Sequence, residues 1–285
     1  MKIVSSGRVL NSREFYEKKK RKRRIKLVLL SVGFLVFFSL LIYLSRQEQF
    51  LIAEVTVLGE EVTNEEEIVS RVERLLAGYY LWVFPRASVL TYPRRVIEQS
   101  LYEEFPIFKS VNLGVGELQT LLITVEERTP FALYCANTFS SADASLPAQA
   151  GECYFLDEEG FIFAPAPSFS GAVYFIYATR DPVENPLGKR FMTIEEFKPL
   201  PKFIETLTIL NIHPLALEVR DDEYSLFLPN GGQIIWRKNN DLALLHSNLE
   251  AFLANDSIRT QENFFDRILY LDLRTENKVF YKFKN

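Results

Sequence analysis

The side chains best suited to chemistry are few. Cys135 and Cys153 are the only cysteines, and His213 and His246 are the only histidines. Two cysteines without a nearby histidine lack the ligands that zinc needs. The H-E-x-x-H, G-x-S-x-G, G-x-G-x-x-G and Walker patterns are all absent. His246 lies at helical spacing beside leucines, which indicates a surface or core histidine. We therefore expect no metal, no cofactor, no small-molecule substrate and no catalytic centre.

Carboxylate runs at 65–67, 157–159 and 221–223 are the remaining candidates for catalysis. Paired carboxylates can hydrolyse glycosides, so a membrane-tethered cell-wall hydrolase is an alternative. The first run falls at an expected helix N-terminus, where acidic residues favour the helix dipole. The other two runs fall in expected tight turns. The tripeptide 231–233, which matches that of peptide-release factors, is interpreted as a turn as well. The sequence thus favours a protein that is not an enzyme.

A membrane helix is the strongest single feature. Residues 27–44 contain no charge, and Ser45 extends the run to nineteen residues. At 1.5 Å per residue this nearly spans a hydrocarbon core of about 30 Å. A cleaved signal peptide has a shorter apolar region that ends in small residues of the A-x-A type. Here the run ends at Ser45-Arg46-Gln47, so we expect an uncleaved anchor over 27–45.

The charge around this helix predicts its orientation. Residues 1–26 carry a net charge of +9, whereas the remainder carries −13. Eight of the nine residues 18–26 are basic, against Arg46 alone just after the helix. The positive-inside rule then places the N-terminus in the cytoplasm and the bulk outside it. A basic run can also bind nucleic acid, but next to a membrane helix it acts as a topological anchor near anionic lipid.

The cysteines fit an oxidising compartment. Each lies beside aromatic residues, and a small, polar stretch of seventeen residues separates them. This pattern predicts a strand, a long loop and a return strand, closed by a Cys135–Cys153 disulfide. Two unpaired thiols are the alternative.

Residues 50–128 contain a strand, two helices and two strands in that order. The first strand covers 50–58, and Thr63 with Glu66 forms a capping box for the first helix. The second helix starts at 91–93 and should direct Val96, Ile97 and Leu101 inward. Two strands follow, at 109–115 and 118–125.

Residues 129–285 are expected to be mainly antiparallel β structure with flanking helices. Short strands are predicted around the two cysteines and at 161–163, 173–176, 215–220, 224–228, 233–237, 267–273 and 278–283. Residues 195–210 and 241–253 have helical patterns.

Four stretches behind this membrane topology resemble the FtsQ/DivIB family of bacterial cell-division proteins over nearly the whole length. They are the opening strand 50–59, the junction 105–107 with 121–132, the aspartate–glycine hairpin 154–163, and the end motif 270–274. The loop between the cysteines is longer than the family leads us to expect.

This resemblance implies a fold and a location. The fold class is α+β, with a basic tail (1–26), a transmembrane helix (27–45), a POTRA domain of βααββ order (50–128) and an extracytoplasmic β domain (129–285). The protein is then a single-pass protein of the cytoplasmic membrane, the inner membrane where a cell has two, located at the division septum.

The resemblance also implies a function. Family members are scaffolds that bind two small bitopic coiled-coil proteins, one of which adds a strand to the terminal edge of the β domain. A POTRA-bearing export or assembly protein is a further alternative. Arg274 matches the partner-facing arginine of the family, although it could simply cap a hairpin, and the nearby lysines could simply guard an edge against aggregation. The expected partner-binding residues are Arg274, Thr275, Lys278, Val279, Phe280, Tyr281, Lys282 and Phe283.

Overall fold

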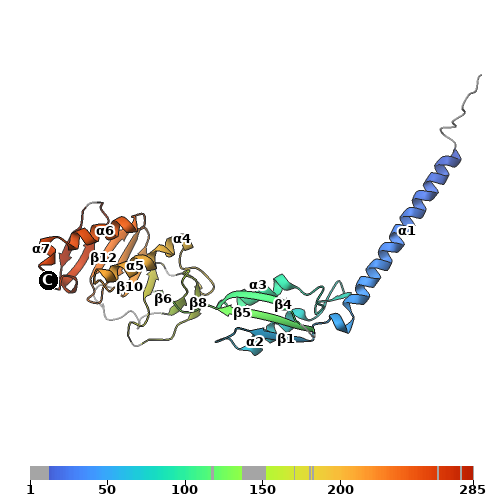
Figure 1. The fold of residues 1–285 in the computed structure, drawn as a ribbon, viewed down its shortest axis with the longest axis horizontal. Coiled ribbons are helices and arrows are strands. Elements are labelled where there is room, and N and C mark those ends of the chain that lie inside the picture. The colour runs from blue at the N-terminus through green and yellow to red at the C-terminus, as the bar shows by residue number, and fades with distance from the viewer. Residues whose placement is uncertain are drawn as a thin grey trace, which may run out of the picture. The chain divides into compact units, whose positions relative to one another are not determined.

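The computed structural model describes residues 13–284 except 117–118, 137–151, 170, 180, 182, 262 and 277. The chain is a mixed α+β protein, as expected (Figure 1). It divides into two compact units. Unit 1 comprises the chain up to Ser100 together with Val111–Val125, and unit 2 comprises Leu101–Ser110 and Glu126–Asn285. The expected loop between the cysteines falls mainly on 137–151 and lies outside the described residues.

A long apolar helix, α1 (Arg13–Ser45), opens the described chain. Its stretch Tyr16–Ser45 is long and apolar enough to cross a membrane, and it is the one such helix among the residues described. Its apolar side chains are exposed; Leu30, for example, is 72% exposed. An apolar helix surface that the rest of the described chain leaves exposed needs another apolar environment, and a single membrane span supplies one.

After α1 the chain forms a short 3-10 turn, Glu48–Phe50, and then small strands and helices. These elements are β1 (Glu54–Leu58), α2 (Glu65–Leu76), β2 (Tyr79–Tyr80), β3 (Phe84–Pro85), α3 (Arg94–Glu104), β4 (Phe108–Val115) and β5 (Thr120–Glu127). Strands β1, β5 and β4 form a three-stranded sheet in that order, in which β1 and β5 are parallel. Strands β2 and β3 form a separate small hairpin.

Two details of this region correct the sequence analysis. The cap of α2 is Asn64, whose side chain accepts a hydrogen bond from the Glu66 amide, so the helix begins one residue later than a cap at Thr63 implies. In α3, Ile97 and Leu101 are buried as expected, but Val96 is 54% exposed. Ile97 and Leu101 are four residues apart and share one face of the helix, whereas Val96 lies about 100° around the helix from Ile97, outside that face.

Unit 2 is built on a nine-stranded sheet of order β14-β13-β12-β11-β10-β9-β6-β7-β8. The strands are β6 (Ala132–Cys135), β7 (Cys153–Leu156), β8 (Ile162–Pro165), β9 (Ile176–Thr179), β10 (Ala216–Arg220), β11 (Glu223–Phe227), β12 (Gln233–Arg237), β13 (Ile268–Asp272) and β14 (Phe280–Phe283). Five of the neighbouring pairs are antiparallel and three are parallel. The expected predominance of antiparallel pairing is thus confirmed.

The strand predicted at 173–176 is found a few residues later in the chain. The strand found there, β9, begins at Ile176 and lies between β6 and β10, parallel to both. Its residues Ile176, Tyr177 and Ala178 are all buried. A strand covered on both faces has no alternating pattern, so its limits are hard to place from the sequence.

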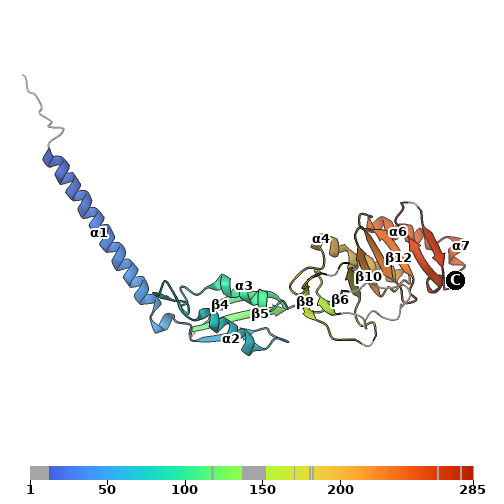
Figure 2. The same ribbon diagram turned by 180° about the vertical axis from the view of Figure 1, so that it is seen from behind.

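Within the described residues, five short helices of unit 2 accompany the sheet. Figure 1 labels α4 to α7 among them, and Figure 2 shows α4, α6 and α7 from behind. They are α4 (Ile194–Phe197), α5 (Pro199–Ile209), α6 (Leu242–Leu253), α7 (Asp256–Arg259) and α8 (Phe264–Arg267). Asp241 caps α6 by accepting hydrogen bonds from the amides of Ala243 and Leu244. The main core lies between these helices and the sheet, with Trp236 and Tyr134 among its fully buried side chains.

Candidate functional site

The terminal strand β14 lies at one end of the nine-stranded sheet, where only β13 pairs with it among the strands described. It is shorter than the predicted strand 278–283, because Lys278 and Val279 precede the paired residues. Phe280 and Tyr281 are 53% and 40% exposed. The outer side of β14 therefore offers backbone N–H and C=O groups to another strand.

Hydrogen bonds show which amides face outward. The amide of Lys284 donates to the Arg267 carbonyl at 2.9 Å, and that of Leu273 donates to Ile235 on β12 at 2.8 Å. Alternation along a strand then directs the amide of Lys282 toward β13 and those of Tyr281 and Phe283 toward the open side.

An aromatic cluster holds β14 in place. The ring centroid of Tyr281 lies 5.6 Å from that of Phe252 on α6 and 5.7 Å from that of Phe264 on α8. Phe283 lies 5.5 Å from Phe264, and the Arg267 guanidinium lies over the Phe283 ring at 5.0 Å. Such edge-to-face contacts fix the strand although one of its sides is unpaired.

The opposite end of the sheet is covered where β8 begins, and β8 ends in Pro165, which has no amide proton to offer. Strand β8 receives backbone hydrogen bonds from the segment 188–191, which the sequence analysis did not anticipate. The amide of Ile162 donates to Lys189 at 2.9 Å, and that of Gly188 donates to Ile162 at 2.9 Å. Phe161 and Arg190 form an isolated antiparallel bridge. Within the described chain, β14 is thus the more open of the two ends of this sheet.

Arg274 follows β13 and is bound by two carboxylates of its own chain. Its Nη2 lies 2.6 Å from Asp272 Oδ2, and its Nη1 lies 2.8 Å from Glu223 Oε1 on β11. Asp272 also accepts a hydrogen bond from the Arg274 amide at 3.0 Å. The bond from the Arg274 side chain is the main reason that the pKa of Asp272 is lowered, and the two carboxylates raise the pKa of Arg274.

These contacts position the guanidinium before any partner arrives. The Arg274 side chain remains 38% exposed, so one face of it is available to a further acceptor. The expected role toward a partner carboxylate and the hairpin-capping role are therefore compatible in one side chain.

Three lysines surround the strand. Lys278, Lys282 and Lys284 are all exposed. The ammonium group of Lys284 donates to the Asn230 carbonyl, which ties the end of the strand to the turn before β12. Thr275 is exposed in the connection between β13 and β14.

A groove of about 600 Å³ adjoins the start of β14. Its apolar lining comes from Leu244 and Ala251 of α6 and from Leu273 and Val279, while Asn248 and Lys278 supply polar atoms. Leu244 is 51% exposed. The sequence analysis missed the groove. Leu244 was the available signal, since it is an apolar residue outside the apolar face of α6.

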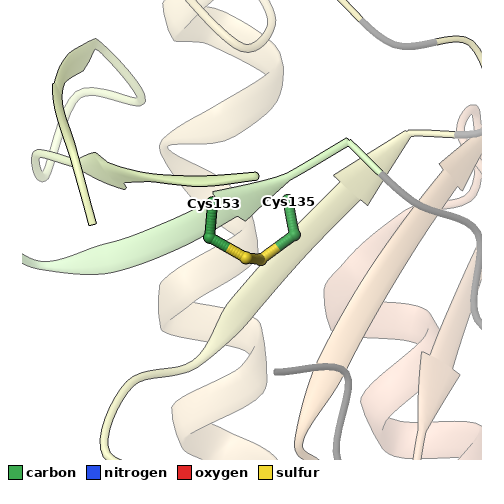
Figure 3. Close-up of a disulfide and its surroundings, with 2 residues drawn as sticks. All are labelled: Cys135 and Cys153. Atoms are coloured by element: carbon green, nitrogen blue, oxygen red, sulfur yellow. A yellow bond between two sulfur atoms is a disulfide. The ribbon is translucent and has the colours of Figure 1, made fainter. Parts of the chain in front are cut away.

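The two cysteines lie directly opposite each other on the paired strands β6 and β7, and a disulfide joins them (Figure 3). Cys135 is buried. The bond closes the neck of the segment that separates the two strands.

A second ion pair of unit 2 lies far from β14 in the sequence. Arg128 and Asp157 are in contact, and their side chains are only 11% and 9% exposed. Asp157 Oδ1 also accepts hydrogen bonds from the amides of Glu159 and Phe161, both at 2.9 Å. The Arg128 guanidinium lies 4.1 Å from the centroid of the Phe161 ring. This pair fixes the hairpin between β7 and β8.

The other acidic runs lie where the sequence analysis expected them. Glu65, Glu66 and Glu67 form the first turn of α2. Asp221 and Asp222 form the turn between β10 and β11, and Glu223 opens β11, where it pairs with Arg220. No group of three His, Cys, Asp or Glu side chains within the described residues could hold a metal ion.

Comparison with protein-family models gave no match, and neither did comparison with curated proteins.

Proposed function

We propose that this chain is a membrane-anchored, non-enzymatic scaffold of the FtsQ/DivIB type, which acts in bacterial cell division. It takes up an extended segment of a small bitopic coiled-coil division protein at the open edge of β14. The observation that carries the proposal is the difference between the two ends of the sheet within the described chain. The segment 188–191 bonds the start of β8 and Pro165 ends that strand, whereas no segment bonds the outer side of β14.

The chemistry of this edge suits strand addition. Main-chain hydrogen bonds supply affinity and are independent of the side chains of the partner. Specificity then needs side-chain contacts beside the edge. Arg274 offers a positioned cation for an acidic residue, and the groove beside Val279 offers an apolar recess.

The remainder of the chain fits the same proposal. Unit 1 has the strand, helix, helix, strand, strand order of a POTRA domain, and we assign it to that fold, with the hairpin β2–β3 as an insertion. The helix α1 is the anchor, with the basic tail in the cytoplasm and the chain after α1 outside it. In a dividing cell the protein is concentrated at the septum.

Substitution of Tyr281 distinguishes the role of its backbone amide from that of its side chain. Tyr281→Pro removes an outward amide, and proline is tolerated where an edge strand faces solvent. Tyr281→Ala loses the same side chain but keeps the amide, so it is the matched control. Each variant carries a fluorescent protein on its cytoplasmic N-terminus, and its thermal unfolding in detergent is compared with that of the unmodified chain.

We expect a mid-cell band for the unmodified chain, a weaker band for Tyr281→Ala, which loses the ring contacts of β14, and none for a folded Tyr281→Pro. A band that survives in Tyr281→Pro keeps the division role and places recruitment elsewhere. A uniform rim of fluorescence in the unmodified chain contradicts the division role, and an export or wall-processing role then becomes the better explanation.

A further inference from the structure

The hairpin β2–β3 exposes two large apolar side chains at its tip. Leu81 is 84% exposed and Trp82 is 93% exposed. They occupy the turn between Tyr80 and Phe84, which are paired across the hairpin. A turn that faced water would normally carry small polar residues, so these two side chains need an explanation.

The backbone conformation of Leu81 and Trp82 is also unfavourable for these residue types. Leu81 has a φ of 49° and Trp82 a φ of 67°. Two successive residues in the left-handed region are typical of a two-residue hairpin turn, where Asn and Gly are the residues that fit. A branched aliphatic residue and an indole in that conformation are unusual.

Contacts within unit 1 fix this hairpin against the end of α1. The Nε of Arg46 donates to the Val83 carbonyl at 3.1 Å, and its Nη2 lies 3.5 Å from the Trp82 carbonyl. The ring of Phe84 meets that of Phe38 edge to face, with 5.6 Å between the centroids.

Phe38 places the hairpin at membrane depth. It lies seven residues before Ser45, inside the uncharged run, and thus about 10 Å from the outer end of the helix. Where α1 crosses a bilayer, a side chain that contacts Phe38 reaches into the hydrocarbon region. The tip beside Arg46 then lies near the boundary between hydrocarbon and head groups, which is the depth that tryptophan prefers.

We infer that the tip of the hairpin β2–β3 inserts Leu81 and Trp82 into the outer leaflet of the bilayer that α1 crosses. The inference rests on α1 as a membrane anchor, which is part of the proposed function. The lipid contact is continuous with the apolar surface of α1. It makes the hairpin a second membrane attachment that limits how unit 1 can turn about the helix axis.

Tryptophan fluorescence tests this insertion directly. The chain has two tryptophans, and the other, Trp236, is fully buried. The full-length protein is reconstituted in phosphatidylcholine vesicles with bromine atoms near the glycerol end of the acyl chains. Subtraction of the Trp82→Phe signal isolates the Trp82 emission. We expect the brominated lipid to quench most of this emission and aqueous iodide to quench little of it.

A matched probe controls for exposure. Val62 is 79% exposed and follows β1 at the end away from α1. In the Trp82→Phe background, Val62→Trp should be quenched by iodide and not by the brominated lipid. Equal behaviour of the probes at positions 62 and 82, with both accessible to iodide, overturns the inference.

Two further measurements distinguish a failure of the membrane anchor or of folding from a failure of the insertion. Resistance of the vesicle-bound protein to alkaline carbonate tests the anchor itself, so loss of resistance contradicts the anchoring part of the proposed function rather than the insertion. Leu81→Asn combined with Trp82→Gly supplies residues that fit the turn. This variant should unfold in detergent at no lower a temperature than the unmodified chain, which shows that the tip is not needed for folding.

Discussion

Asp272 is the residue that organises the end of the chain. It accepts hydrogen bonds from the Arg274 amide, from Nε at 2.9 Å and from Nη2 at 2.6 Å. The guanidinium is therefore oriented in the free protein. When a partner carboxylate binds, the Arg274 side chain therefore loses little further conformational entropy, which favours affinity.

The titration of Asp272 gives a pH-dependent prediction. Its pKa in the folded chain is below the ordinary 3.8. Its stabilising effect is thus complete above that value and is lost as the pH falls through the folded pKa. We expect Asp272→Asn to lower the free energy of unfolding by about 0.5–1 kcal/mol at neutral pH, since the ion pair is partly screened by solvent. Urea unfolding of both proteins should converge in strong acid; a difference that persists there contradicts the prediction.

The buried pair Arg128–Asp157 could not be predicted from the sequence, although both residues belong to stretches that were recognised. The sequence marks the turn at Asp157 but does not show which cation approaches it from 29 residues away. In addition, Gly160 has a φ of 72°, and a Cβ there would meet the ring of Phe197 at 2.9 Å. The turn residues were therefore predictable, and the contacts that make them necessary were not.

Removal of one member of this pair should be costly. Asp157→Ala leaves a nearly buried guanidinium without its carboxylate and removes two hydrogen bonds of the turn. We expect a loss of about 3 kcal/mol or more in the free energy of unfolding. Arg128→Met combined with Asp157→Asn should cost less than the sum of the two single changes, because no unpaired charge remains. Strict additivity in chemical denaturation contradicts coupling between the two residues.

At the scale of elements, the predictions from sequence agree with the structure where a turn is determined by its own residues. The tripeptide 231–233 was interpreted as a turn, and its two glycines lie in the turn before β12. In the structure Gly231 has a φ of 78°, and the Gly232 amide donates to the Asn230 side chain. Such signals are local and can be read from a few residues.

Elements that depend on distant partners were missed or displaced. The helices α7 and α8 have four residues each, too few for a periodic pattern. The parallel neighbours of β9 come from segments far along the chain, and nothing in its own four residues identifies them. The hydrogen bonds between β8 and the segment 188–191 likewise join residues that are distant in the sequence, so they could not be predicted from either segment alone.

The disulfide between β6 and β7 should stabilise unit 2 measurably. It joins residues with a sequence separation of 18. In the chain-entropy model a loop of this size contributes about 3 kcal/mol. We expect Cys135→Ser with Cys153→Ser to lose that amount in urea unfolding, and the unmodified chain in reductant to follow the same curve. Identical unfolding of the oxidised chain and the double variant contradicts the prediction, and non-reducing peptide mapping shows whether the bond is present.

At the scale of the whole molecule, charge is divided sharply along the sequence. Eight of the nine residues 18–26 are basic, and the chain after residue 26 is strongly acidic. The basic cluster adjoins the uncharged part of α1, where loop charge decides orientation.

Neutral replacement of the basic residues 18–24 should therefore disturb the orientation. With alkaline phosphatase fused to the C-terminus, which is active only outside the cytoplasm, we expect a marked loss of enzyme activity per molecule. Neutral replacement of Lys278, Lys282 and Lys284 is the control and should leave the activity unchanged. Unchanged activity in the first variant shows that the helix is oriented by something other than its flanking charge.

The unequal ends of the nine-stranded sheet have a consequence for assembly size. A sheet open at both ends can be lengthened from either side and can grow into a fibre. Within the described chain, β8 is bonded at Ile162 to the segment 188–191 and ends in Pro165, whereas nothing pairs with the outer side of β14. We therefore expect this sheet to accept one strand, at β14, whether the strand comes from a partner or from the β14 of a second copy. The chain then ends an array of strands and does not extend it, and pairing with itself competes with pairing with a partner.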